Sequence, residues 1–259
     1  MIKIEQKRLE TFCAVMSAMV LECRLKINKD GITTRAVDTA NVAMVQAILP
    51  NTSFREFTVD PCEVGMDVLK WKGALNVMKP DEIVSIEVPK TGRITISGGG
   101  YDYKINPLDC NTVRKDPNVP GFNLPCTLSV SGKEFAEAIK ALSIISDKVR
   151  LSITGKTLEL SAEGDTDALK KEIDGTMPDG KKNEIAAISL FSLDYMRDMT
   201  KGPMKNAEIV TISLGIDHPV RFDFEVEGTG ASVIIAPRIE QEPDADQIKA
   251  REKGANMGA

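Results

Sequence analysis

The sequence predicts an α+β fold made of two similar domains, each combining amphipathic helices with antiparallel strands. Three observations lead to this prediction. A proline-rich segment lies near the middle of the 259-residue chain. Helical and strand patterns that precede this segment return after it. Each half, about 110 residues long, can enclose its own core, because 42% of the chain is apolar.

The connecting segment, residues 111–127, is not expected to form a helix or a central strand. Its prolines are Pro117, Pro120 and Pro125. Each removes a backbone donor and pushes the preceding residue toward an extended conformation. Its apolar side chains are Val119, Phe122 and Leu124. We therefore expect an extended strap whose apolar side chains either lie beneath it or contact a partner; an ordinary interdomain loop is the alternative.

Composition limits the functional classes. The formal net charge of −5 gives no overall signal for nucleic-acid binding, so any affinity for phosphates requires cations gathered on one face. The five cysteines are irregularly spaced and form no CxxC pair, which indicates reduced thiols in a cytoplasm. No stretch reaches the ~18 apolar residues that a membrane span needs, and no export signal is present. We expect a soluble cytoplasmic protein with no membrane partner.

In the first half, apolar residues recur at helical spacing over residues 7–21 and 66–78. The first stripe consists of Leu9, Phe12, Met16 and Met19, and the second of Val68, Trp71, Leu75 and Met78. These stripes predict two amphipathic helices. Strands are predicted at residues 24–28, 32–36 and 42–49 after the first helix, and at 83–88, 93–97 and 101–105 after the second.

The second half repeats the first at an offset of 126 positions. Phe135, Ala138, Leu142 and Ile145 follow the first stripe at this distance. The same offset carries Leu25 onto Leu151 and Ile86 onto Ile212, whereas the second helices match one residue short of it. A period held across helices and strands indicates one supersecondary unit built twice. We predict an N-terminal domain at 1–110, a C-terminal domain at 128–240 and a disordered polar tail at 241–259.

Groups for catalysis are lacking. His218 is the single histidine and stands before Pro219, so neither a histidine relay nor a histidine zinc site has support. The Gly-Lys pairs at 132–133 and 155–156 lack the first glycine of a phosphate-binding loop. Asp194 and Asp198 have metal-ligand spacing, but neighbouring cations favour a solvated helix face. We expect no enzyme activity, no metal and no cofactor.

Several motifs carry a family resemblance over about residues 1–240. They are VDTANVAM at 37–44, the connecting segment, DHPV at 217–220 and APRIE at 236–240. With the paired halves, these motifs resemble the sliding clamps of the proliferating cell nuclear antigen family, in particular its archaeal members. The resemblance implies a homotrimeric ring with helices inside and sheets outside.

Such a ring would encircle double-stranded DNA without sequence specificity and act as a processivity factor in replication and repair. It would tether DNA polymerase, flap endonuclease and DNA ligase through their PIP-box peptides. It would be opened by an ATP-driven clamp loader and would catalyse nothing itself. Two alternatives stay open: a DNA-damage checkpoint clamp subunit that assembles with unlike partners, and an unrelated two-domain enzyme.

The resemblance also assigns residues to three surfaces. The DNA-facing cations would be Lys7, Arg8, Lys70, Lys72, Lys79, Lys133, Lys140, Arg197, Lys201 and Lys205. The partner-peptide groove would be lined by Val42, Met44, Val119, Pro120, Phe122, Leu124, Pro219, Ile234, Ile235, Ala236 and Pro237. The subunit interface would pair residues 101–105 with 168–173 of the next subunit, using Tyr101, Tyr103, Ile105, Ala168, Lys170 and Ile173. Because Glu10, Thr11 and Ser17 replace lysines that the family often has, the first helix is expected to contribute less to DNA contact.

Overall fold

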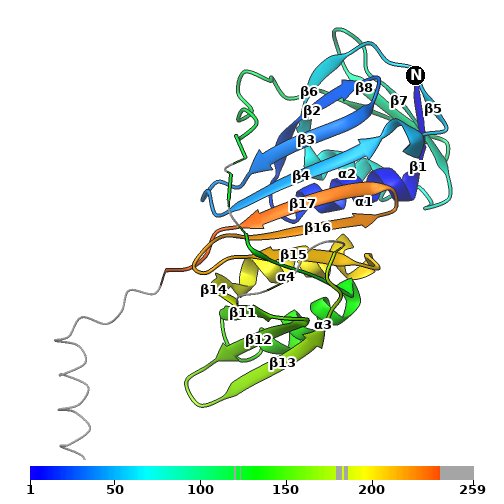
Figure 1. Ribbon diagram of the computed structural model, residues 1–259. Coiled ribbons are helices and arrows are strands. Elements are labelled where there is room, and N and C mark those ends of the chain that lie inside the picture. Colours follow the sequence, from blue (N-terminus) through cyan, green and yellow to red (C-terminus); the bar gives the residue numbers. More distant parts are fainter. Residues whose placement is uncertain (120, 123, 179–182, 184–185, 240–259) are drawn as a thin grey trace, which may run out of the picture.

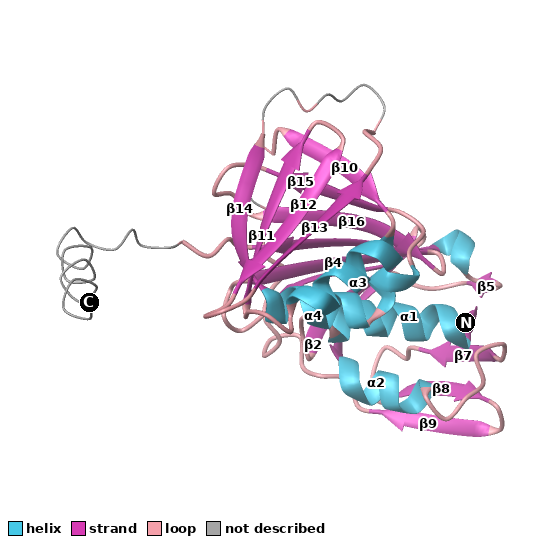
Figure 2. Cartoon of the chain, turned by 90° about the horizontal axis from the view of Figure 1, so that it is seen from below, coloured by secondary structure: helices cyan, strands magenta, loops and turns pink. Residues whose placement is uncertain are grey.

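A computed structural model describes residues 1–119, 121–122, 124–178, 183 and 186–239. In this part of the chain, three antiparallel sheets and four α-helices form an elongated α+β molecule (Figure 1). Figure 2 shows the four helices side by side, with the sheets arranged around them. The predicted fold class is confirmed. The predicted tail at 241–259 lies outside the described residues.

The largest sheet contains strands from both halves. Its order is β10 (Cys126–Val130), β15 (Val210–Leu214), β16 (Val220–Val226), β17 (Thr229–Ile235), β4 (Ala43–Pro50), β3 (Gly31–Val37), β2 (Glu22–Asn28) and β6 (Cys62–Asp67). The halves meet where β17 pairs antiparallel with β4, with Ile235 opposite Ala43 and Gly230 opposite Ile48. We call this pairing the seam.

Each half also has a smaller sheet. In the first half, the order is β5 (Glu56–Phe57), β1 (Ile2–Glu5), β7 (Ile83–Glu87), β8 (Ile94–Gly98) and β9 (Tyr101–Ile105). In the second half it is β13 (Ala168–Asp174), β12 (Thr157–Glu163), β11 (Lys148–Thr154) and β14 (Ala187–Ser192). Strands β9 and β13 are therefore both edge strands.

The helices are α1 (Gln6–Ser17), α2 (Val68–Leu75), α3 (Gly132–Leu142) and α4 (Leu193–Lys201), with 3-10 turns η1 (Asn51–Ser53) and η2 (Pro203–Asn206). Helix α1 packs on α2, and α3 packs on α4. Their apolar stripes bury Phe12, Trp71 and Phe135 against the sheets. The rings of Phe135 and Phe222 lie 5.5 Å apart, which joins α3 to β16.

The 126-residue repeat is confirmed by the boundaries of the elements. Strand β2 begins at Glu22 and β11 at Lys148, while α1 begins at Gln6 and α3 at Gly132. Helix α2 begins at Val68 and α4 at Leu193, one residue short of this offset, as the sequence predicted. The predicted first-half strands are also present, with ends shifted by one or two residues.

Both first-half helices are shorter than predicted. Helix α1 ends at Ser17, because the chain turns toward β2 and the Leu21 carbonyl accepts a hydrogen bond from the Val68 amide. Helix α2 begins only at Val68, because Met66 belongs to β6 and the Asp67 carboxylate caps the helix by accepting from the Lys70 amide at 3.0 Å. Strands β1, β5 and β6 were not predicted from the sequence.

Among the described residues, no helix is both long enough and apolar enough to cross a bilayer.

Candidate functional site

The predicted groove residues from the two halves meet at one end of the seam. Met44 on β4 lies opposite Ile234 on β17, and the Ala236 amide donates to the Val42 carbonyl at 2.8 Å. Val220 pairs with Ile235, which brings Pro219 to the same end. The fold therefore brings together residues that are almost 200 positions apart in sequence.

The loop before β4 is organised by Asp38. Its carboxylate Oδ1 accepts hydrogen bonds from the Val42 and Ala43 amides, both at 2.8 Å, and Oδ2 accepts from the Ala40 amide at 3.2 Å and from the Tyr195 hydroxyl at 2.8 Å. Burial raises the pKa of Asp38, but these hydrogen bonds outweigh burial, so its pKa lies below the ordinary value. Burial and the bond to Asp38 raise the pKa of Tyr195 to about 12.

Basic side chains hold the connecting segment against the first half. Arg24 Nη2 donates to the Val113 carbonyl at 2.6 Å. Lys26 Nζ lies 2.6 Å from Asp116 Oδ2, and Arg35 Nη1 donates to the Pro117 carbonyl at 3.4 Å. Arg114 Nη2 donates to Asn41 Oδ1 at 2.6 Å, which attaches the segment to the loop organised by Asp38.

Figure 1 shows the segment passing one end of β4 and β17. Ala43 pairs with Ile235 at this end. Val119 is 43% exposed, and Phe122 and Leu124 are half-buried. These exposures leave apolar surface available beside the seam. Pro120 lies outside the described residues.

Three of the predicted groove residues are buried. Ile235 is fully buried, and Ile234 and Met44 are only 8% and 9% exposed. The Ile235 side chain faces the core with Ala43, so it supports the floor of the groove from within and offers no surface to a peptide. Ala236 and Pro237 remain half-buried at the surface.

The segment after β17 borders cavities that were not predicted from the sequence. Pro237 and Arg238 line a cavity of about 330 Å³ together with Ile188 and Leu190 of β14. The Arg238 amide donates to the Leu190 carbonyl at 2.7 Å. No sequence signal could place β14 here, because the contact joins positions far apart in the chain.

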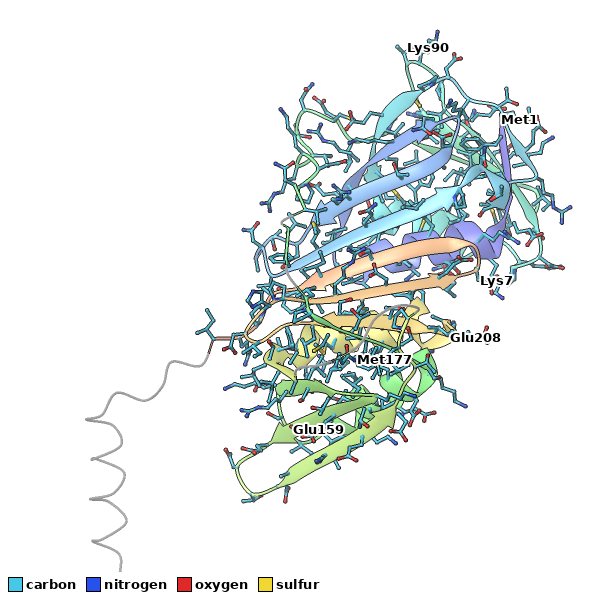
Figure 3. The ribbon with its side chains drawn as sticks, in the orientation of Figure 1. Met1, Lys7, Lys90, Glu159, Met177 and Glu208 are labelled. Atoms are coloured by element: carbon cyan, nitrogen blue, oxygen red, sulfur yellow. The ribbon has the colours of Figure 1, made fainter. Side chains whose placement is uncertain are left out.

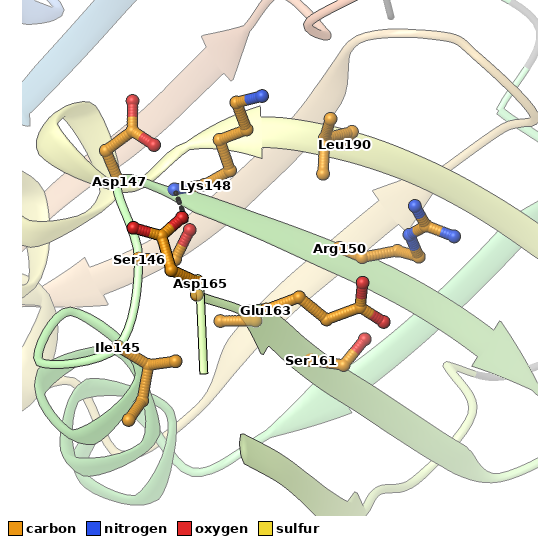
Figure 4. Close-up of a pocket in the computed structure, with 11 residues that line it drawn as sticks. Ile145, Ser146, Asp147, Lys148, Arg150, Ser161, Glu163, Asp165 and Leu190 are labelled. Atoms are coloured by element: carbon orange, nitrogen blue, oxygen red, sulfur yellow. Dashed lines mark hydrogen bonds between the residues drawn. The ribbon is translucent and has the colours of Figure 1, made fainter. Parts of the chain in front are cut away.

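A larger cavity of about 560 Å³ adjoins it and shares Arg150 and Leu190 (Figure 4). Its wall mixes acidic and basic groups, with Arg150 and Glu163 both drawn in Figure 4. The Asp147 carboxylate also pairs with Arg238 at 2.9 Å.

Most predicted DNA-facing cations of the first half already have carboxylate partners. Lys7 lies beside the turn between β16 and β17 (Figure 3), with Nζ 2.6 Å from Glu227 Oε1. Arg8 pairs with Glu5 at 3.5 Å, and Lys70 with Asp67 at 3.1 Å. Lys72 donates to the Ser17 hydroxyl at 3.3 Å.

The second half differs. Arg197 pairs with Asp194 at 2.8 Å. Within the described part of the chain, six predicted cations have no carboxylate at ion-pair distance; they are Lys72, Lys79, Lys133, Lys140, Lys201 and Lys205. Four of these six are on or beside α3 and α4. Free cationic charge is therefore concentrated on the second-half helices.

The two strands predicted to meet between subunits are both sheet edges. On β9, Tyr101 and Tyr103 are 51% and 41% exposed, while Ile105 is buried. On β13, Lys170 bridges Glu159 (Figure 3) at 2.6 Å and Glu172 at 3.0 Å.

Ala168 is exposed and Ile173 is buried on β13. Ile105 and Ile173 can thus contribute only their backbones to a strand pairing. An apolar hollow of about 510 Å³ lies next to β13, between Leu169 and the α3 residues Ala138 and Ala141.

No group of three or more His, Cys, Asp or Glu residues with the spacing of a metal site occurs among the residues that the structure describes. His218 Nδ1 lies 2.6 Å from the Ile216 carbonyl in a turn, so its ring interacts with the local backbone.

Comparison with known proteins finds matches to a single protein family. The family profile described as "Proliferating cell nuclear antigen, C-terminal domain" matches residues 118–239. A DNA polymerase sliding clamp of Methanocorpusculum labreanum is 45% identical over 242 residues, covering 89% of this chain and 94% of the relative. One of Methanoregula boonei is 45% identical over 230 residues, covering 87% and 92%.

Solved structures agree with the sequence relatives. The structure of the C-terminal region of FEN-1 bound to A. fulgidus PCNA has a TM-score of 0.83 to this chain at 30% identity, covering 93% of this chain and all of that one. PCNA from Thermococcus kodakaraensis has a TM-score of 0.81 at 21% identity, covering 92% of this chain and 100% of that chain, and shares the fold.

Proposed function

Because this chain belongs to the proliferating cell nuclear antigen family of DNA polymerase sliding clamps, we propose that it forms a homotrimeric ring around double-stranded DNA. The ring tethers replication and repair enzymes through their PIP-box peptides. It works in the cytoplasm, is opened by a clamp loader and has no catalytic activity. Its subunit consists of domains at 1–110 and 128–240 joined by residues 111–127, of which the last two already belong to β10.

The observation that carries this proposal is the relation between the seam and the two free edges. In the internal repeat, β9 is the counterpart of β17, and β13 is the counterpart of β4. Strands β17 and β4 pair with each other inside the chain. Strands β9 and β13 therefore correspond to the two strands that pair in the seam, but in the described chain neither has a partner at this edge. A head-to-tail contact between copies would repeat the seam, and such a contact gives a ring when its rotation closes.

The seam also supplies the register of the subunit contact. Ile105 pairs with Ile94 as Ile235 pairs with Val220, which aligns β9 with β17. Ile173 pairs with Leu158 as Leu49 pairs with Ile32, which aligns β13 with β4. Transferring the seam pairs to the free edges sets Tyr103 opposite Leu169, Asp102 opposite Lys170 and Tyr101 opposite Lys171.

This register is chemically consistent. Tyr101, Tyr103 and Leu169 then share the helix-side face, where the apolar hollow beside α3 can receive the two rings. Asp102 and Lys170 share the outer face as an opposite-charge pair. Both agreements are independent of the family relationship.

The helix face supports non-specific DNA contact. A chain with a net charge of −5 can attract phosphates only where its cations are gathered, and Lys133, Lys140, Lys201 and Lys205 are free of ion pairs among the described residues. Lys7 and Lys70 are instead paired with Glu227 and Asp67. We therefore assign most of the DNA contact to α3, α4 and η2.

The groove beside the seam supports peptide binding. It combines Val42, Met44, the apolar residues of the connecting segment and the segment after β17. Clustered apolar anchors suit a short peptide that docks one helical turn and one extended stretch. The A. fulgidus relative, which was solved with the C-terminal region of FEN-1, is consistent with this assignment.

Two measurements test the proposal. Light scattering of the purified protein should give a mass near three times 28.2 kDa. A concentration-independent monomer would contradict the ring. Calorimetric titration with a PIP-box peptide should show binding that falls at least about tenfold in a Phe122→Ala, Leu124→Ala double variant. Ile209→Ala is the control, since Ile209 is 55% exposed and lies outside the groove. Equal binding by the double variant would exclude the groove.

A further inference from the structure

One side-chain hydrogen bond joins the helix face of the second half to the peptide groove. Tyr195 of α4 donates its hydroxyl to Asp38 Oδ2 at 2.8 Å, across a sequence separation of 157 residues. Asp38 follows the end of β3 and is only 8% exposed. The bond therefore connects the two halves at the end of the seam where the groove lies.

Asp38 determines the shape of the groove loop. Its carboxylate holds the Ala40, Val42 and Ala43 amides, and the loop includes Asn41 in the left-handed region at φ 59°. Asparagine tolerates this conformation, but the conformation still has to be held by its surroundings. The Val42 carbonyl then accepts the Ala236 amide from the opposite wall.

The two carboxylate oxygens have different environments. Oδ1 accepts two short amide bonds at 2.8 Å, whereas Oδ2 accepts one amide bond at 3.2 Å and the Tyr195 hydroxyl. Without the hydroxyl, Oδ2 keeps only the longer bond. The carboxylate can then rotate, and the three amides that it holds lose their common acceptor.

We propose that Tyr195 is a positioning residue of the peptide groove, which fixes the Asp38 carboxylate from α4 and so sets the loop that carries Val42 and leads into β4. This inference rests on the proposed peptide-binding function. Arg114 holds the same loop from the connecting segment through Asn41. The loop is thus fixed by hydrogen bonds from two sides, and Tyr195 supplies the one from α4.

The test compares two single substitutions that each remove one hydrogen bond between the halves. Tyr195→Phe keeps the ring and removes only the hydroxyl. Ser53→Ala is the matched control, because Ser53 Oγ donates to the Gly228 carbonyl at 3.1 Å at the opposite end of the seam. For the wild type and both variants, calorimetry measures the affinity for a PIP-box peptide, and hydrogen exchange measures protection of the Val42 and Ala43 amides.

Tyr195→Phe should bind the peptide about fivefold more weakly, as expected when only about one fifth of the molecules hold the competent loop. Its Val42 and Ala43 amides should exchange faster, while Ser53→Ala should match the wild type in both measurements. Asp38→Asn, which replaces the acceptor oxygens in part by an amide donor, should lose affinity similarly.

Unchanged peptide affinity and amide exchange in Tyr195→Phe would overturn the role of Tyr195 while leaving the groove intact. Equal losses in Ser53→Ala would show a general weakening of the contact between the halves and would also overturn it. Failure of the wild-type protein to bind the peptide would overturn the proposed groove itself, and with it this inference.

Discussion

Replacing Tyr103 by alanine should open the proposed ring. Tyr103 is 41% exposed on the free edge β9, and in the register taken from the seam its ring covers Leu169 of the next subunit. An aromatic side chain buries about 150–250 Å² in all, so about 60–100 Å² of Tyr103 remains for the contact to bury. At about 25 cal/mol per Å², this is about 2 kcal/mol for each subunit contact.

The closed ring multiplies this loss. Three contacts together lose about 6 kcal/mol, which is about four powers of ten in the association constant of the trimer. The midpoint concentration for assembly varies as the square root of that constant, so it should rise about 100-fold. Sedimentation velocity or light scattering over a dilution series measures this midpoint directly.

The control is Ile48→Ala. Ile48 is 40% exposed and lies on β4, which is the counterpart of β13 but already pairs with β17 inside the chain. This variant should assemble like the wild type. The proposed contact is wrong if Tyr103→Ala dissociates at the wild-type concentration, or if Ile48→Ala dissociates as readily as Tyr103→Ala.

Three further results are expected. Asp102→Lys and Lys170→Asp should each weaken the trimer, because the two charges are opposite each other in the proposed register. The double variant should regain most of the lost trimer stability, as measured by sedimentation. No recovery would mean a different register. Lys201→Ala should reduce the salt dependence of duplex binding, measured by fluorescence anisotropy, by up to about 0.9 in the slope of log affinity against log salt for each phosphate contact that is lost. Lys70→Ala should change this slope less, because Lys70 is already paired with Asp67. A larger change in Lys70→Ala would contradict the assignment of DNA contact to the second-half helices. Asp38→Asn should lower the free energy of unfolding in urea by about 1–3 kcal/mol at pH 7. The difference from the wild type should shrink as the pH falls below 3.8, the ordinary pKa of aspartate, because the pKa of Asp38 is lowered in the folded state and its stabilisation is lost on protonation. A constant difference down to pH 2 would argue against the hydrogen-bonded carboxylate.

The sequence predicted the repeated core well because helical and strand periodicities are local signals. The stripe containing Phe12 and its counterpart containing Phe135 both lie on helices whose first residues are 126 positions apart. The strand β1 was missed because it passes directly into α1 without a turn. Met66 was assigned to a helix because its spacing from Val68 is ambiguous, although Asp67 was a usable N-cap signal.

The surfaces were harder to predict, because they depend on contacts between distant positions. The consecutive apolar residues Val233, Ile234 and Ile235 give no indication of which side chain faces the core. The pairing of Lys7 with Glu227 joins the first helix to the last hairpin, and no local sequence pattern predicts it. The role of Asp38 likewise becomes visible only when α4 brings Tyr195 against it.

The seam between β17 and β4 has a mechanical consequence for a trimer. Of its six sheet-to-sheet junctions, three are closed within single polypeptides and are reinforced by the covalent link through residues 111–127. Only the other three can part without unfolding a subunit. In the proposed ring, a clamp loader would therefore have three equivalent interfaces at which to admit DNA, and fusing one chain head to tail to its neighbour would close one of them without altering the lumen.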